Sequence, residues 1–155
     1  YDGRLIKQTD VNMLAYPLGV ITDKEQTLRD INYYFDRIDP NGPAMSNAII
    51  AVLHARLGDP ETAFKVFKKS YTDKLRPPFG VLSENANNSR VSFATGLGGI
   101  LQSVIFGFAG VEITPEGIIQ LPTRLPSHWK SLTVTGVGVD RLTFKVENPD
   151  YKATK

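Results

Sequence analysis

The sequence predicts a mainly α-helical part followed by a small β part. Over about the first two thirds of the chain, apolar residues recur at spacings of three and four, which places them along one face of a helix. After Gly110, short runs rich in β-branched residues alternate with Pro and Gly, a pattern typical of strands and turns. We therefore expect two domains, residues 1–109 and residues 110–155.

The first two predicted helices are defined by their end signals. Across residues 7–18 the apolar positions fall on one helical face, and the Pro-Leu-Gly turn at residues 17–19 closes the segment. Thr22 and Glu25 have the spacing of a capping box, so they predict that a second helix begins there and extends through Ile38.

Two further helices follow at once. Pro43 suits the first turn of the third helix, and Gly58 is its stop signal. Asp59 and Pro60 form an N-cap and N1 pair that opens the fourth helix. Helices that come in pairs separated by short breaks are typical of stacked helical hairpins, as in a solenoid or an α/α toroid.

The last helix and the strands complete the prediction. Residues 96–108 are apolar at nearly every position, so we expect a helix that is buried on most of its surface. Strands are expected at residues 111–114, 117–121, 131–135 and 141–147. Roughly four or five helices do not close a toroid, and a sheet of roughly four or five strands is thin with exposed edges. We therefore expect a fragment of a longer polypeptide.

Composition argues against several classes of function. The 18 basic and 16 acidic residues are scattered and give a net charge of +2, so no basic stripe predicts a nucleic-acid partner. The chain has no cysteine, and His54 and His128 lie far apart without ligand spacing, so neither a metal nor a cofactor is expected. The longest apolar stretch, residues 99–111, is too short to span a bilayer, so no membrane partner is expected. The compartment, periplasmic, secreted or cytoplasmic, stays open.

Residues 77–102 carry the most informative pattern. Glu84 lies in a loop rich in Pro, Gly, Asn and Ser, where a carboxylate is a candidate catalytic base, although a solvated surface Glu is the ordinary alternative. The glycines that follow lack the preceding strand and the lysine of a phosphate-binding loop, so we expect them to allow close helix packing. Gln102 is polar in a nearly all-apolar helix, and we expect it to be a hydrogen-bonded structural anchor near the site.

Six short motifs follow one another over nearly the whole chain and together resemble the C-terminal portion of glycoside hydrolase family 65, a family of α-glucoside phosphorylases and hydrolases. In order they are Ile6-Lys7-Gln8-Thr9-Asp10-Val11, Gly42-Pro43-Ala44-Met45-Ser46, Ala55-Arg56-Leu57-Gly58-Asp59, Phe79-Gly80-Val81-Leu82-Ser83-Glu84, Thr95-Gly96-Leu97-Gly98-Gly99-Ile100-Leu101-Gln102 and Leu125-Pro126-Ser127-His128-Trp129. The resemblance implies the last helices of an (α/α)6 barrel followed by part of a C-terminal β-sandwich domain.

The resemblance also implies a chemistry and a set of site residues. Members invert the configuration at the anomeric carbon. A carboxylic acid protonates the glycosidic oxygen while activated water or free phosphate attacks the anomeric carbon from the opposite face. By the resemblance, Glu84 is the general base, Lys7 and Gln8 bind the cleaved glucose, and Thr95 lines the pocket. The general acid lies upstream of this chain, in the remainder of the same polypeptide, so the isolated chain should be inactive.

The choice between water and phosphate depends on two positions. In phosphorylases of the family a His and a Ser near the glycine-rich helix start help to hold phosphate, and the matching residues here are Phe93 and Gly96. Phe offers no donor, so we favour hydrolysis of a small carbohydrate, an α-linked disaccharide such as trehalose or kojibiose, or a glucosylated acceptor. A phosphorylase that releases glucose 1-phosphate and a non-catalytic carbohydrate-binding module are the alternatives. Assembly as a homodimer also stays open.

Overall fold

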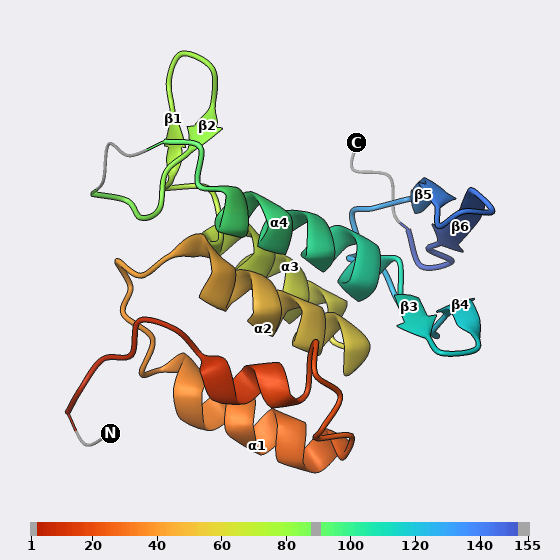
Figure 1. Cartoon of the computed structure of the whole chain (residues 1–155), viewed down its shortest axis with the longest axis horizontal. Helices are drawn as coiled ribbons and strands as arrows, with labels where there is room; N and C mark the ends of the chain where they lie inside the picture. Colours follow the sequence, from red (N-terminus) through yellow and green to blue (C-terminus); the bar gives the residue numbers. More distant parts are fainter. Residues whose placement is uncertain (1–2, 88–90, 152–155) are drawn as a thin grey trace.

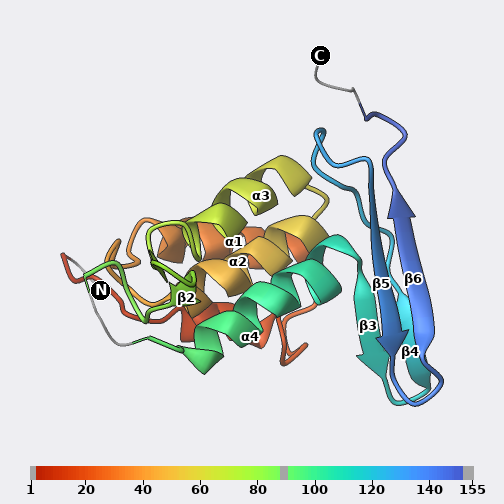
Figure 2. The same cartoon turned by 90° about the horizontal axis from the view of Figure 1, so that it is seen from above.

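The computed structural model describes residues 3–87 and 91–151, which form a group of helices beside a group of strands. Figure 1 shows the helices stacked against one another, and Figure 2 shows the strands of the C-terminal part along one side of them. The expected order, a helical part and then a β part, is confirmed. The division into two domains at residue 110 stays a prediction.

The helical part contains four α-helices among the described residues. They are α1 (Lys24–Phe35), α2 (Ala44–Arg56), α3 (Pro60–Lys69) and α4 (Ala94–Gln102). A 3-10 helix, η1 (Asp10–Leu14), precedes α1, and a π-helix, η2 (Ser103–Phe108), continues α4. Helix α2 packs against α3, α4 and η2, and most of its residues are buried, so the main hydrophobic core surrounds it.

The prediction of a helix over residues 7–18 is wrong, because only η1 forms there. The chain before η1 is extended: Ile6 N–H donates to Arg37 O at 2.8 Å, and Asp39 N–H donates to Ile6 O at 2.9 Å. After η1 the chain turns back, so that Val20 N–H and Ile21 N–H both donate to Leu14 O. Hydrogen bonds to other segments therefore occupy carbonyl groups, those of Ile6 and Leu14, that a helix over residues 7–18 would use within itself.

Two predicted helix starts are wrong by one residue. The cap of α1 is Asp23, whose Oδ1 accepts a hydrogen bond from Gln26 N–H at 2.6 Å, so the expected capping box of Thr22 and Glu25 does not form. Asp is the stronger N-cap residue than Thr, which explains the shift. Pro43 is the extended N-cap residue of α2 rather than part of its first turn.

The boundary between α2 and α3 is confirmed as predicted. Gly58 follows α2 with φ of +86°, a conformation that glycine adopts without the strain of a side chain. Asp59 caps α3 by accepting a hydrogen bond from Thr62 N–H at 3.0 Å, and Pro60 is the first residue of the helix.

Close packing at the start of α4 is confirmed for two glycines. A Cβ on Gly96 would lie 2.7 Å from Phe93 Cδ1, and a Cβ on Gly99 would lie 3.0 Å from Ala48 Cβ. Packing does not explain Gly98, where a Cβ would meet no atom within 4 Å.

The expected burial of this helix on most of its surface is wrong. Leu97 and Leu101 on α4 remain 44% and 60% exposed. Apolar composition predicts a buried helix, but one face of α4 has no neighbour among the described residues.

The β part consists of two antiparallel hairpins. Strand β3 (Val111–Thr114) pairs with β4 (Gly117–Gln120), and β5 (Ser131–Val137) pairs with β6 (Leu142–Glu147). The four predicted strands are thus confirmed with small boundary differences. Apolar side chains from both hairpins share a small core. Sequence patterns missed a further short hairpin, β1 (Leu75–Arg76) with β2 (Val81–Leu82), which lies between α3 and α4.

Arg56, the last residue of α2, joins the helical and β parts. Its Nε donates to Phe106 O at 3.1 Å, and its guanidinium group pairs with the Glu112 carboxylate on β3. The same guanidinium carbon lies 4.6 Å from the centre of the Tyr16 ring. Burial raises the pKa of Tyr16 to about 12, although the Arg56 charge acts in the opposite direction.

Candidate functional site

Two residues predicted from separate motifs meet in the structure. Lys7 Nζ lies 3.1 Å from Glu84 Oε1. The Lys7 side chain is 66% exposed and that of Glu84 is 25% exposed, so the pair is accessible from solvent on the lysine side. The structure therefore places the expected base beside an expected sugar-binding cation.

The position of Lys7 is fixed by the backbone around it. Ile6 forms a parallel bridge with Ile38, just after α1. Ser46, in the first turn of α2, donates its hydroxyl to Lys7 O at 3.2 Å. The segment before η1 is thereby held against the start of α2, with the Lys7 side chain directed at the loop of Glu84.

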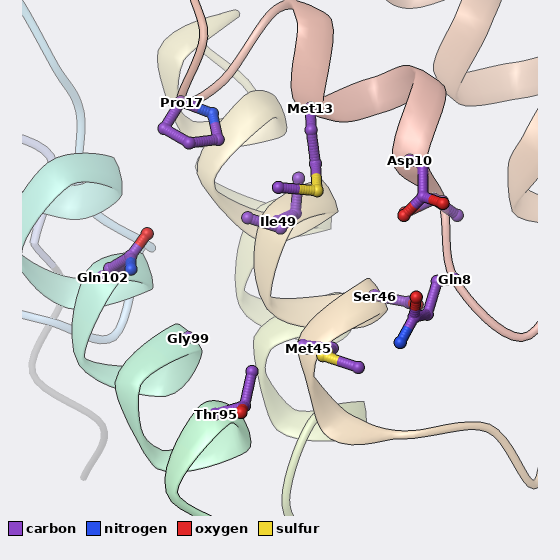
Figure 3. A pocket seen from close by; sticks show the side chains of 11 residues that line it. Gln8, Asp10, Met13, Pro17, Met45, Ser46, Ile49, Thr95, Gly99 and Gln102 are labelled. Carbon is purple, nitrogen blue, oxygen red and sulfur yellow. The ribbon is translucent and has the colours of Figure 1, made fainter.

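A cavity of about 390 Å³ lies between η1, α2 and α4 (Figure 3). Its polar lining includes Gln8 and Thr95, both predicted to contact substrate. Neither Lys7 nor Glu84 lines it; Lys7 precedes Gln8 in the sequence, and its carbonyl group accepts a hydrogen bond from the lining residue Ser46. A mainly apolar pocket of this size with a few polar groups is typical of a small-molecule site. The remaining lining residues are Thr9, Asp10, Met13, Pro17, Met45, Ser46, Ile49, Gly99 and Gln102.

Gln102 lies at the far end of this cavity from Thr95, on the same helix (Figure 3). Its Oε1 accepts a hydrogen bond from the Tyr16 hydroxyl at 2.9 Å. The prediction that Gln102 is hydrogen-bonded is confirmed, and its role as a structural anchor near the site stays a prediction.

Sequence reasoning missed the apolar walls of the cavity. Met13, Met45 and Ile49 come from η1 and α2 and meet only when these elements pack together. Taken singly, each is an ordinary core residue, so no local pattern distinguishes it from the interior of a helix. Ser46 had a weak signal, since it closes one of the six motifs.

The start of α4 offers apolar atoms at the two positions where the resemblance implies phosphate-binding groups in phosphorylases. Phe93 is the N-cap residue of α4, and its own backbone N–H donates to Leu82 O at 3.0 Å. Its ring lies against Gly96, which has no room for a side chain. The side chains at these two positions therefore provide no hydrogen-bond donor for an anion.

Both histidines are packed rather than arranged for catalysis. Burial lowers the pKa of His54, even though Asp59 Oδ2 lies 3.9 Å from His54 Nδ1 and acts in the opposite direction. The lowered pKa favours the neutral form of His54 at pH 7. The His128 ring packs against Phe64 with ring centres 4.4 Å apart.

Neither a metal site nor a membrane span is found in the part of the chain that the structure describes. No group of three or more Asp, Glu or His residues among residues 3–87 and 91–151 could hold a metal ion. No helix within the same ranges is long and apolar enough to cross a membrane.

Comparison with known proteins identifies relatives over almost the whole chain. Two proteins named kojibiose hydrolase, from Mucilaginibacter mallensis and Flavobacterium johnsoniae, are 49% and 47% identical to it over 148 and 146 residues. The resemblance to glycoside hydrolase family 65 is confirmed. A protein-glucosylgalactosylhydroxylysine glucosidase from Dictyostelium discoideum is 36% identical over 146 residues. No protein-family model matches the chain.

The matches cover 95% and 93% of this chain but 22% and 21% of the two kojibiose hydrolases. This chain thus spans about a fifth of the length of these relatives. Among solved structures, a putative kojibiose phosphorylase from the human microbiome aligns with a TM-score of 0.70 and 22% identity, over 92% of this chain and 19% of that one. That likeness supports a partial family 65 fold and, at this identity, concerns the fold alone.

Proposed function

We propose that this chain is the C-terminal part of an inverting glycoside hydrolase that cleaves an α-glucosidic bond with water. The observation that carries the proposal is the 3.1 Å contact between Lys7 and Glu84, together with a cavity lined by Gln8, the neighbour of Lys7 in the sequence, and by Thr95. In this proposal the helices are the last of an (α/α)6 barrel, residues 1–109, and strands β3 to β6 belong to a C-terminal β-sandwich, residues 110–155.

Each residue has a distinct part in the proposed reaction. The Glu84 carboxylate accepts a proton from water as the water oxygen attacks the anomeric carbon. The Lys7 ammonium and the Gln8 amide donate hydrogen bonds to glucosyl hydroxyls, and Thr95 lines the pocket. The general acid comes from the upstream polypeptide, and inversion requires it to lie about 6.5 to 9.5 Å from Glu84, which leaves room for the water.

The names of the relatives support the proposed substrate class, and the start of α4 supports water as the attacking group. Relatives named kojibiose hydrolase, acid trehalase and glucosylgalactosylhydroxylysine glucosidase support an α-glucoside, either a disaccharide such as kojibiose or trehalose or a glucosylated acceptor. The apolar contact between Phe93 and Gly96 favours water over phosphate as the attacking group.

The direct test is Glu84→Gln in the complete polypeptide. Loss of a general base reduces turnover by about 10²- to 10⁴-fold, while the fold should be unchanged. Glu116→Gln, at an exposed residue between β3 and β4, is the matched control and should retain full turnover. Retention of most activity by Glu84→Gln contradicts the assignment.

A phosphorylase is the second candidate, because the structural neighbour is named a putative kojibiose phosphorylase. The two reactions differ in their products. Hydrolysis releases free glucose, first as the β-anomer, with or without phosphate in the buffer. Phosphorolysis needs inorganic phosphate and releases glucose 1-phosphate, so analysis of the products in both buffers separates the two reactions.

A further inference from the structure

We propose that Arg76 and Ser83 are positioning residues that hold the loop of Glu84 in the orientation needed for the reaction. This inference rests on the proposed function of Glu84 as general base. The two side chains connect backbone carbonyl groups just after Glu84 with those of the hairpin root, so they act through the position of Glu84 rather than through its chemistry. The loop follows the β1–β2 hairpin, which projects beyond the helices in Figure 1.

Ser83 fixes the chain immediately before Glu84. It is fully buried, and its backbone N–H donates to Lys74 O at 2.9 Å. Its hydroxyl lies 3.0 Å from Lys74 O and 2.8 Å from Asn85 O. Because a hydroxyl donates one proton, it serves these two carbonyl groups in turn. The hydroxyl thus spans Glu84, from the hairpin root to the residue that follows Glu84.

The hairpin root is itself anchored to α3. Lys74 is 1% exposed, and its Nζ donates to Asp73 Oδ1 at 2.8 Å and lies 3.4 Å from Lys69 O, the carbonyl at the end of α3. The carbonyl group of Lys74 is the one that accepts from Ser83. Hydrogen bonds therefore connect the loop of Glu84, through Lys74, to the packed helix α3.

Arg76 fixes the chain on the other side of Glu84. Its Nη2 donates to Asn85 O at 3.0 Å and to Ala86 O. Its Nη1 donates to Asp73 O at 3.0 Å, so the guanidinium group connects the hairpin root with the two residues after Glu84. Hydrogen bonds from a charged donor are roughly twice as strong as neutral ones, which suits a group that must hold an irregular loop.

These contacts are needed because the loop of Glu84 is irregular and catalysis requires a defined position of the Glu84 carboxylate. Residues 83–87 contain no helix or regular strand, so the backbone has few ladder hydrogen bonds to define it. A misplacement of a catalytic group by about 1 Å can reduce turnover by about 10²-fold. Loss of the Arg76 contacts should therefore impair the chemical step. The backbone of Lys7 is held by Ser46 on α2, so sugar binding should change much less than turnover.

The test is Arg76→Ala in the complete polypeptide, with an α-glucosidic disaccharide as substrate. We expect kcat to fall by about 10- to 100-fold while KM changes by less than about threefold. Arg76→Lys keeps the charge but cannot span two segments, so its kcat should lie between those of the parent and the Ala variant. The matched control is Arg37→Ala, which also removes an arginine that donates to a backbone carbonyl, that of Tyr33, and it should leave kcat unchanged.

The kcat of folded variants decides the inference. A kcat of folded Arg76→Ala within about twofold of the parent overturns it. If Arg76→Ala does not fold, Arg76→Lys and Ser83→Ala replace it: a lower kcat at unchanged KM in folded protein supports the inference, and an unchanged kcat overturns it. Failure of the proposed function is separate, because it is seen as retained activity of Glu84→Gln. An inactive Glu84→Gln with a fully active Arg76→Ala overturns the positioning role alone.

Discussion

Lys7 Nζ lies 3.1 Å from Glu84 Oε1, although η1 and helices α1 to α3 lie between the two residues in the sequence. One loop precedes η1 and is held by α2, and the other follows a hairpin anchored to α3. Helix packing therefore brings together two charged groups that no local pattern connects. Their contact has different consequences for stability and for binding.

Lys7→Ala should change the free energy of unfolding by less than about 1 kcal/mol, because exposed ion pairs contribute little. The KM for an α-glucoside should rise by about 10- to 100-fold, since hydrogen bonds from a charged donor contribute about 1.5 to 3 kcal/mol. Arg29→Ala breaks the exposed pair with Glu25 at 3.7 Å and is the control for stability and for kinetics. An unchanged KM in Lys7→Ala excludes Lys7 from the sugar site.

The glycines of α4 should respond differently to alanine. Gly98→Ala should stabilise the protein by about 0.5 to 1 kcal/mol, because it reduces the freedom of the unfolded chain and its Cβ meets no atom within 4 Å. Gly96→Ala should destabilise it by about 1 to 3 kcal/mol, because its Cβ would clash with Phe93 and Leu82. Urea denaturation measures the free energy of unfolding of both variants. Equal effects of the two substitutions would show that α4 does not pack as described.

Lys74 should contribute to stability mainly through its buried alkyl chain. Lys74→Met keeps most of that volume, and Asp73 is half exposed and remains hydrated, so the free energy of unfolding should change by less than about 1.5 kcal/mol. Lys74→Ala leaves a cavity and should cost about 2 to 4 kcal/mol. Thermal and urea denaturation of the Lys74→Met and Lys74→Ala variants measure the two changes in stability. If Met costs as much as Ala, the ammonium group and not the alkyl chain is the stabilising part.

His54 should make stability depend on pH near neutrality. Because burial lowers the pKa of His54 below its ordinary 6.5, the unfolded chain takes up the proton at a higher pH than the folded protein does. The His54 contribution to stability is therefore lost as pH falls below 6.5, until the folded pKa is passed. His54→Asn should flatten this part of the curve of unfolding free energy against pH. A parent protein that becomes more stable in this window would instead indicate that pairing with Asp59 dominates.

Local signals in the sequence predicted the elements whose ends are set within one helical turn. Asp59 caps α3 and Gly58 ends α2 because the relevant hydrogen bond or backbone angle involves neighbouring residues. The segment at residues 7–18 had a helical pattern too, but Ile6 pairs with Ile38 and withdraws the chain from a longer helix. Pattern alone could not reveal that competition, since it depends on a partner in another part of the sequence.

The sequence by itself determined the order of helices and strands, the resemblance to family 65, and the choice of Glu84, Lys7, Gln8 and Thr95 as site candidates. Only the tertiary structure decided that Lys7 and Glu84 form an ion pair and that a cavity lies between η1 and α4. The same is true of the hydrogen bonds from Arg76 and Ser83 to the backbone next to Glu84. The physical reason is range. Caps, turns and periodicity are fixed by interactions over a few residues, whereas a site is formed by distant segments that meet only when the helices bury their apolar faces against one another.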